Sequence, residues 1–293
     1  MWAVALGLNL LVSTFSSLVK RVYAQTSTAP AAVMMALSHG LGLMPISIVV
    51  GLLLPHAISW STWTVFLLLT EGFLIALFIW FSYVALRLLP AALFQTIFQL
   101  RVVVVILLGW TFLAEGLSIL QIFGAVLLLA SGLLAIWAPA RAHKSGKKQY
   151  PHFRKGVVFS LVSAFTLGAG LVVEKAALQY MDLGAYFIFG FFTQFAWLAV
   201  FATIQAIRRG GVHISMKTTR QATYLGLLSA LIGFTYLAAL KLADNISLVQ
   251  ALTSMVVPMT AVAAHIFLHE KDDSRLLWTA IVIGLVGFIV VAV

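Results

Sequence analysis

Long runs of apolar residues without any charge dominate the chain. They cover residues 116–140, 183–206, 221–240, 245–269 and 276–293, and a longer run between 22 and 70 is broken by prolines. A helix of about 20 apolar residues crosses the ~30 Å hydrocarbon core of a bilayer. Strands of a membrane barrel would instead alternate apolar and polar residues. The pattern therefore predicts an all-α integral membrane protein.

The apolar blocks predict ten transmembrane helices, whose expected ranges are 2–20, 31–54, 62–86, 91–113, 118–138, 157–178, 184–207, 221–241, 246–268 and 275–292. The first block begins without a basic segment or a small-residue cleavage site, so we expect a span there and not a removable signal peptide. A basic linker separates five helices from five. The predicted parts are a first repeat at 1–140, the linker at 141–155 and a second repeat at 156–293.

The two halves resemble each other in sequence. At offsets of 155 or 154 residues the matched pairs are Lys20 with Lys175, Gln95 with Gln250, Gly132 with Gly287, and Gly72 with Gly226. Because each half has an odd number of helices, the second half must enter the membrane upside down. Inverted five-helix repeats are typical of secondary transporters, which bind their solute near the midplane, between the repeats.

Composition and charge support a membrane location. The chain is 62% hydrophobic and 9% charged, with a mean hydropathy of +1.09, which excludes a soluble domain. Its net charge of +10 comes from Lys and Arg at the ends of apolar blocks, so we do not expect nucleic-acid binding. By the positive-inside rule the linker is cytoplasmic and both termini are outside, in a bacterial-type plasma (inner) membrane. The absence of cysteine excludes disulfides and thiolate chemistry.

Loose motifs of small and apolar residues mark the ends of both halves. They lie at 83–86, 90–110, 113–118 and Gly132, and at 238–240, 247–258, 268–270 and Gly287. In these motifs, and over nearly its whole length, the chain resembles the drug/metabolite transporter superfamily, EamA type. The resemblance implies a ten-helix carrier of amino acids, nucleobases, sugars, phosphorylated metabolites or drugs, driven by protons or by exchange. One departure is Arg101, near the position that matches Pro258, since such families often keep proline in both halves.

Two ionisable residues, Glu71 and Arg101, lie well inside predicted spans. Charged side chains in a membrane are costly and usually functional. The two helices form an antiparallel hairpin, on which Glu71 lies ~7–8 Å deeper than Arg101 at ~1.5 Å per residue. Two interpretations stay open. Arg101 binds an anion or zwitterion while Glu71 takes up a coupling proton, or the two form a buried ion pair that fixes helix packing.

Glutamines form a second candidate group. Gln95 and Gln250 occupy equivalent positions, so a pseudo-two-fold axis would bring them to opposite sides of one cavity, with Gln99 one turn from Gln95. On a straight helix Arg101 would point ~120° from Gln95 and ~160° from Gln99. Either the glutamines line the cavity and Arg101 reaches Glu71 sideways, or the reverse holds. Hydrogen bonding between helices is the alternative role for the glutamines.

Aromatic and titratable residues complete the candidates. Trp80, Tyr83 and Tyr236 are expected either as an apolar wall for an organic solute or as packing and interfacial residues. His39 either faces the cavity, where it would titrate near neutral pH, or bonds within its helix. Lys20, Lys175 and Glu174 (a further set, near predicted helix ends) are expected to anchor at the interface.

The remaining chemistry is expected to be sparse. His265, His269 and Glu270 lack a further ligand, so no metal site is predicted, and no cofactor is expected. Without a nucleotide-binding loop the chain alone cannot be an ATP-driven pump, and its loops are too short for a catalytic domain, so no enzyme is predicted.

The predicted function is secondary active transport, as an exporter or exchanger, of a small organic solute such as an amino acid or related metabolite, by alternating access. Protons taken up at Glu71 or His39, or solute exchange, would drive it. The alternatives are a lipid flippase or scramblase, and an intramembrane enzyme or non-transporting partner. The expected partners are the solute, protons and membrane lipid. The oligomeric state stays open, and a monomer is compatible with the pattern.

Overall fold

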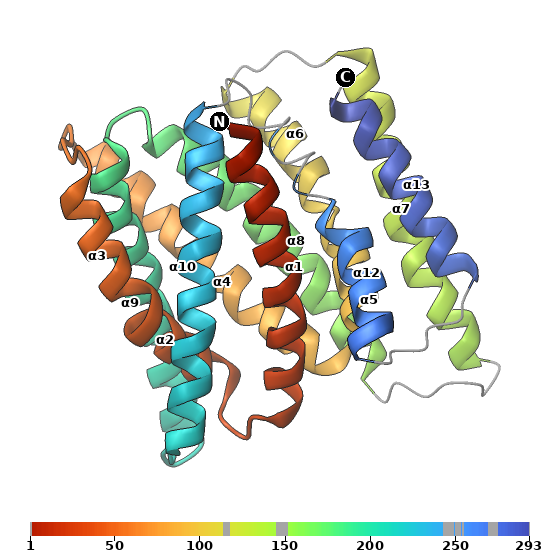
Figure 1. Cartoon of the computed structure of the whole chain (residues 1–293), viewed down its shortest axis with the longest axis horizontal. Coiled ribbons are helices and arrows are strands. Elements are labelled where there is room, and N and C mark those ends of the chain that lie inside the picture. Colours follow the sequence, from red (N-terminus) through yellow and green to blue (C-terminus); the bar gives the residue numbers. More distant parts are fainter. Residues whose placement is uncertain are drawn as a thin grey trace.

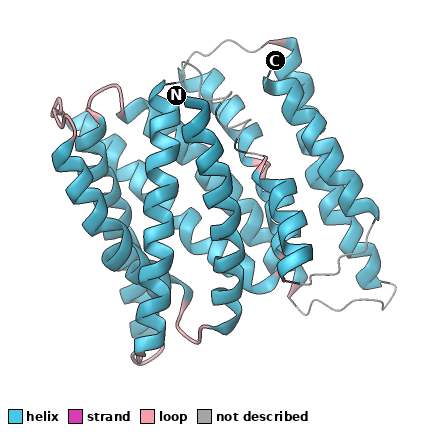
Figure 2. Cartoon of the chain, viewed as in Figure 1, coloured by secondary structure: helices cyan, strands magenta, loops and turns pink. Residues whose placement is uncertain are grey.

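The structure is a computed structural model that describes residues 2–113, 118–144, 152–242, 249, 253, 255–268 and 275–292. Over these residues the protein is all-helical, and the only extended pairing is one isolated bridge between Ile58 and Met181. Figure 2 shows helices filling almost the whole described chain. The predicted all-α class is therefore confirmed.

Most described helix ends lie within four residues of the expected ranges, but α1 and α7 each end six residues later than expected and α10 begins five residues earlier. They are α1 (Trp2–Thr26), α2 (Ala31–Ser38), the π-helix η1 (His39–Leu43), α3 (Met44–Leu53), α4 (Thr62–Leu88), α5 (Ala91–Phe98), α6 (Arg101–Leu113), α7 (Ile119–Lys144), α8 (Phe153–Ala177), α9 (Leu183–Arg208), α10 (Met216–Leu242), α12 (Val256–Phe267) and α13 (Arg275–Ala292). In the described residues, the segments long and apolar enough to cross a membrane number six: Ala31–Leu53, Thr62–Leu88, Ala91–Leu113, Phe153–Ala177, Leu183–Arg208 and Met216–Ala239.

Two of these segments are not regular α-helices throughout. In the first, α2 passes through η1 into α3, and Pro45 follows within the first turn of α3. Proline has no N–H and its ring crowds the carbonyl four residues earlier, and a single wider turn is a common way to absorb such a disturbance. In the other, α5 ends at Phe98 and α6 begins at Arg101, with Gln99 and Leu100 in a turn.

The helices lie side by side as one bundle (Figure 1). The start of α1 and the end of α13 lie at one end of the bundle, whereas the end of α7 and the start of α8 lie at the other. At one edge α7 packs against α13, and in the body of the bundle α4 packs against α8 and α10 against α1. The segments that flank the basic linker are thus opposite both termini.

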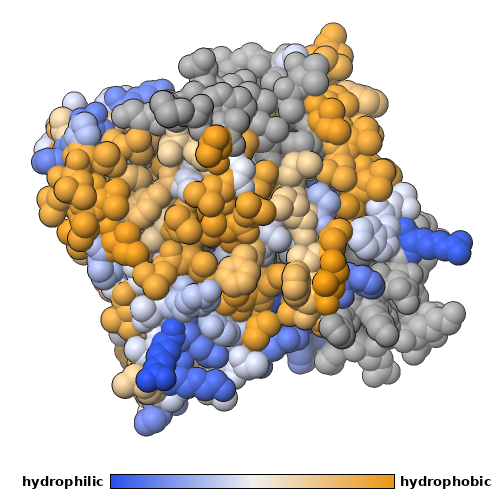
Figure 3. Space-filling view, in the orientation of Figure 1, coloured by the Kyte–Doolittle hydropathy of each residue, from blue (hydrophilic) through white to orange (hydrophobic). Residues whose placement is uncertain are grey.

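Large apolar side chains cover much of the outer surface. Leu53, Phe112 and Ile119 are each more than three-quarters exposed, and Figure 3 shows hydrophobic residues over much of one face, with hydrophilic ones gathered toward its lower edge. Exposed apolar patches of this extent are rare on soluble monomers. Hydrocarbon is the surrounding that suits this surface.

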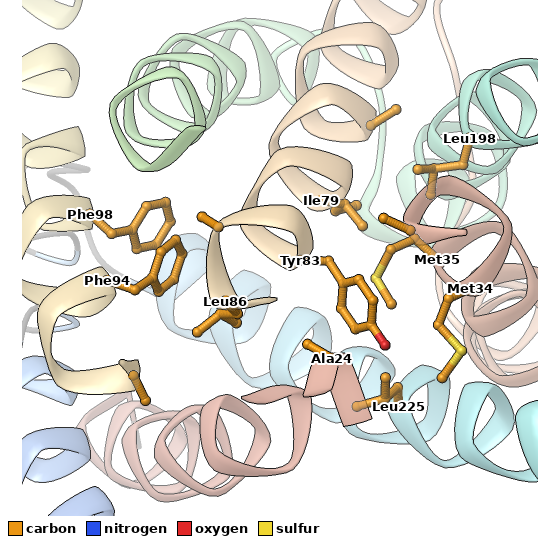
Figure 4. Packing of buried hydrophobic residues seen from close by; sticks show 14 of the residues in the cluster. Ala24, Met34, Met35, Ile79, Tyr83, Leu86, Phe94, Phe98, Leu198 and Leu225 are labelled. Carbon is orange, nitrogen blue, oxygen red and sulfur yellow. The ribbon is translucent and has the colours of Figure 1, made fainter. Parts of the chain in front are cut away.

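Buried apolar residues fill the bundle between the helices. In the cluster of Figure 4, Tyr83 of α4 lies among Met35 of α2, Ala24 of α1 and Leu225 of α10, and all four are nearly inaccessible. Burial of large side chains contributes roughly 1.5–3 kcal/mol each relative to water. In lipid, close packing is the larger part of that benefit.

Two glycines permit close approach between helices of different halves. A Cβ at Gly226 of α10 would collide with the carbonyl oxygen of Ser38 and would lie 2.6 Å from Gly42 Cα. A Cβ at Gly72 of α4 would lie 2.6 Å from Thr193 Oγ1 on α9. Only glycine lets these backbones come so near.

Two arginines join α1 and α4 at the end of the bundle opposite the termini (Figure 1). Arg21 Nη1 donates to the carbonyl oxygen of Leu86. Arg87 Nη2 donates to the carbonyl oxygens of Ala29, at 2.6 Å, and Ser27, at 3.4 Å. Each arginine thus donates to backbone carbonyl oxygens that lie close to the end of the helix carrying the other arginine. We call these contacts the arginine clasp.

Candidate functional site: a central polar cavity

A cavity of about 250 Å³ lies in the middle of the bundle. Its walls come from α1, α2, η1, α4, α5, α6, α8, α9, α10 and α12. Most of the lining is apolar, with the aromatic side chains supplied by Phe78, Phe94, Phe98, Tyr186, Phe191 and Tyr236. An apolar cavity with a few convergent polar groups is the usual form of a small-molecule site.

A stripe of polar residues on α1 forms one wall. Its cavity-lining members are Asn9, Ser13, Ser16, Ser17 and Lys20. Their spacing of three to four residues places them on one helix face. Asn9 Nδ2 also donates to Ile232 O, at 2.9 Å, and to Thr235 Oγ1, at 3.0 Å, which ties α1 to α10. This stripe was not predicted, although its period was readable in the sequence.

Gln95 lines the cavity, as one sequence alternative expected, and donates from Nε2 to Ser17 Oγ at 2.7 Å. Gln99 points elsewhere: its amide donates to Ser131 of α7, which donates to Ala280 O of α13. The expected partner Gln250 lies outside the described residues.

Arg101 also lines the cavity, beside Gln95. Its guanidinium lies 4.6 Å from the centre of the Phe98 ring, and Nη2 is 3.4 Å from Thr253 Oγ1. The two sequence alternatives assumed a straight helix, but the chain breaks between α5 and α6. The break turns Arg101 to the side that Gln95 occupies. A guanidinium facing a cavity suits a carboxylate or phosphate group.

Glu71 lies one layer behind the cavity wall and is fully buried. Its Oε1 accepts hydrogen bonds from Tyr186 Oη at 2.9 Å and from Gln194 Nε2 at 2.7 Å, while Oε2 has no hydrogen-bond partner. Tyr186 and Gln194 themselves line the cavity. Glu71 and Arg101, both described residues, contact different groups and form no ion pair in this conformation.

Lys20 and Glu174 both line the cavity, so the expectation that they anchor at the interface is wrong. Helix α1 continues to Thr26, which leaves Lys20 more than a turn inside it, half-buried. Glu174 of α8 is 5% exposed and faces inward. For Lys20 the expected helix end was six residues too early, whereas α8 ends within one residue of its expected end and Glu174 simply faces inward near that end. The cavity thus carries charges of both signs.

Of the remaining candidate residues, two line the cavity and two pack elsewhere in the bundle. His39 of η1 lines the cavity, with Nδ1 3.1 Å from Met35 O, and Tyr236 lines it too. Trp80 packs on Phe81 and Phe201, at ring separations of 5.0 and 5.3 Å. Tyr83 lies in the apolar cluster of Figure 4. Neither Trp80 nor Tyr83 belongs to the cavity wall, so the packing interpretation fits these two.

No group of three or more metal-ligating side chains that could hold an ion occurs within the described ranges. Of the expected trio, His265 is described, whereas His269 and Glu270 lie outside these residues.

Comparison with known proteins shows that a solved structure has a similar fold. No family model and no curated protein matches the chain. A solved structure, described only as the crystal structure of a protein, is similar, with a TM-score of 0.66 over 97% of this chain and 98% of that chain. The sequence identity is 16%. At that identity the likeness shows a shared fold and nothing about activity.

Proposed function

We propose that the protein is a secondary active transporter of a small organic solute, working by alternating access as an exporter or exchanger. The observation that carries the proposal is the central cavity, which combines apolar walls with the inward-facing charges of Lys20, Arg101 and Glu174. Charges kept inside a membrane protein usually serve solutes or ions. We further propose a ten-helix inverted repeat of the drug/metabolite transporter superfamily, EamA type.

Helix boundaries support the repeat. Both bounds of α10 follow those of α4 by 154 residues, and α12 begins 155 residues after α6. Those offsets are the same as the ones that align the two halves of the sequence. Met255, just before Val256, is a turn residue, as Leu100 is just before Arg101.

Packing also supports the repeat, because a contact between two helices recurs between the equivalent helices of the other half. Helix α4 packs on α8 as α10 packs on α1, and α6 packs on α8 as α12 packs on α1. The close contacts at glycine follow the same rule. Gly72 of the first half lies against Thr193 of the second, and their equivalents, Gly226 and Ser38, lie against each other. A two-fold axis in the membrane plane would produce this pattern.

The lining supports a small zwitterionic or anionic solute, such as an amino acid or related metabolite. Lys20 and Arg101 suit a carboxylate, Glu174 suits an ammonium group, and the phenylalanine walls suit an apolar body. The cavity volume of about 250 Å³ lies below the roughly 300–1,000 Å³ of typical drug-sized sites. A metabolite of a few to a dozen heavy atoms is therefore the best fit.

The proposed orientation follows from charge. The segments that flank the basic linker lie opposite both termini (Figure 1). We place the linker end in the cytoplasm of a bacterial-type plasma membrane, by the positive-inside rule.

Counterflow in proteoliposomes tests the function. A radiolabelled panel of amino acids, nucleosides, sugars and organic cations is offered to wild type, Arg101→Gln and the control Arg220→Gln, whose arginine is exposed on α10. We expect uptake of one solute class, loss of that uptake in Arg101→Gln, and near-normal uptake in Arg220→Gln.

Equal uptake by the two arginine variants would refute the assigned site. No uptake of any panel member by folded wild type would refute solute transport. The alternative of lipid translocation would then be tested with a fluorescent lipid.

A further inference from the structure

Two carboxylates meet inside the bundle around one tyrosine. Glu71 is on α4, Glu174 on α8 and Tyr186 on α9. Tyr186 Oη donates to Glu71 Oε1 at 2.9 Å and interacts electrostatically with Glu174, and the two carboxylates also interact with each other. The chain has only eight acidic residues. Two of them adjacent in a membrane interior is costly and requires an explanation.

Cations do not explain the arrangement. Among the residues that the structure describes, no ion pair joins Glu71 or Glu174 to a basic side chain. The donors that Glu71 receives both bind Oε1, and its fully buried Oε2 has no partner. An ionised carboxylate in such a place would leave its charge uncompensated, at a large cost. Two negative charges side by side at low dielectric would cost still more.

The two carboxylates differ in access. Glu174 lines the cavity, whereas Glu71 is separated from it by Tyr186 and Gln194. Tyr186 is fully buried, and its hydroxyl can donate to one carboxylate while it accepts from the other. A proton arriving at Glu174 from the cavity therefore has a bonded route to Glu71 and no direct one.

We propose that Glu71, Tyr186 and Glu174 form a proton-binding site that holds a single proton and fills it from the cavity. The transfer is balanced: Glu174 gives its proton to Tyr186 Oη as the hydroxyl proton of Tyr186 passes to Glu71, and no electron is exchanged. Gln194 holds Glu71 Oε1 in place throughout. The other charged or titratable groups on the surrounding helices that face the cavity are Lys20, His39, Arg101 and Tyr236.

The occupied site changes the charge that a solute meets. An empty site carries two negative charges close to the cavity that Lys20 and Arg101 line, whereas a site that holds one proton carries a single negative charge. Anion binding is therefore tighter in the protonated state. This role in coupling rests on the proposed transport function, whereas the proton site itself does not.

Infrared difference spectroscopy on the full chain in lipid nanodiscs tests the site without any solute. Spectra at acidic and alkaline pH are compared in the carboxylic-acid carbonyl region, for wild type, Glu71→Gln, Glu174→Gln and Tyr186→Phe. Asp182→Asn is the matched control, because Asp182 is the third described carboxylate and lies in the loop before α9. Size-exclusion profiles and thermal unfolding confirm that each variant is folded.

We expect wild type to show a protonated buried carboxyl that is slow to exchange in heavy water. Glu71→Gln should lose this band, Glu174→Gln should change the pH range over which it appears, and Tyr186→Phe should shift its frequency through loss of one donor. Asp182→Asn should match wild type. If Glu71→Gln does not fold, Tyr186→Phe and Glu174→Gln still decide the result.

The proposal is overturned if Glu174→Gln and Tyr186→Phe give the same band and the same titration as Asp182→Asn. This outcome is separate from failure of the transport proposal. A correct infrared result without uptake in counterflow would leave a proton site without a carrier, whereas uptake with an unchanged band would leave a carrier without this site.

Discussion

Gly226→Ala is the substitution for which the structure predicts the sharpest structural effect. The added methyl group would meet the carbonyl oxygen of Ser38, Gly42 Cα at 2.6 Å and Leu43 N at 3.0 Å. All three are backbone atoms, so no side chain can rotate away. The helix pair α10 and α2–η1 has to separate to accept the change.

The expected magnitude follows from two opposing terms. Alanine in place of glycine favours a helix by up to about 1 kcal/mol. Overpacking a tight contact costs typically about 1–3 kcal/mol, and rigid backbone neighbours place this case at the upper end. We therefore expect a net loss of about 1–2 kcal/mol in the free energy of unfolding, which is roughly a 5- to 30-fold change in the unfolding equilibrium.

Reversible unfolding in mixed detergent–denaturant micelles measures the change, with Gly7→Ala as the control. No atom lies within 4 Å of a Cβ at Gly7, which is also helical, so that variant should be neutral or slightly stabilised. Gly72→Ala should be intermediate, because part of its contact is the Thr193 side chain. Equal stabilities for Gly226→Ala and Gly7→Ala would refute the close approach of α10 and α2–η1.

Three further predictions concern the site and the topology. Arg101→Lys keeps the charge but loses the planar contact with Phe98. KM for an anionic solute should therefore rise about tenfold, equivalent to about 1.4 kcal/mol. Unchanged uptake kinetics would contradict the assignment of Arg101 to the solute site. Ser131→Ala removes the acceptor of the buried Gln99 amide and should cost about 1–3 kcal/mol of stability. Transport should persist, because Gln99 faces away from the cavity. A thermal-shift assay together with counterflow checks both expectations, and lost transport at full stability would contradict the placement of Gln99. Single cysteines at His56 and Ser215 should react with an impermeant maleimide from opposite faces of the membrane, and same-face labelling would overturn the orientation.

Helix positions were predictable because apolar periodicity and length determine them. The bounds of α4 and α9 differ from expectation by two residues or fewer. The π-helix before Pro45 and the turn at Gln99 were not predicted, since neither changes the apolar composition of its segment. Arg101 was misplaced on the helical wheel for the same reason: a wheel assumes one continuous axis.

The cavity was only partly predictable. Arg101, Gln95, His39 and Tyr236 do line it; the first three were identified by being polar within an apolar block, and Tyr236 as an aromatic residue near them. Glu174 was missed, because a charged side chain near a predicted helix end can reach the membrane interface and was assigned there. Which helices pack around a given face depends on contacts between distant segments, and a single sequence does not contain that information in readable form.

The arginine clasp has a consequence for which helices can move relative to each other. Hydrogen bonds to charged groups contribute roughly 1.5–3 kcal/mol each, and two arginines hold the linker end of α1 against α4. A motion that parts α4 from α1 and from the segment after α1 must break both arginines' bonds, whereas a motion that carries them together breaks none. The lower-barrier route keeps α1 and α4 as one rigid unit, so the sliding surfaces lie along other helices. Weakening the clasp would therefore let α1 and α4 separate more easily at that end without changing a residue of the cavity wall.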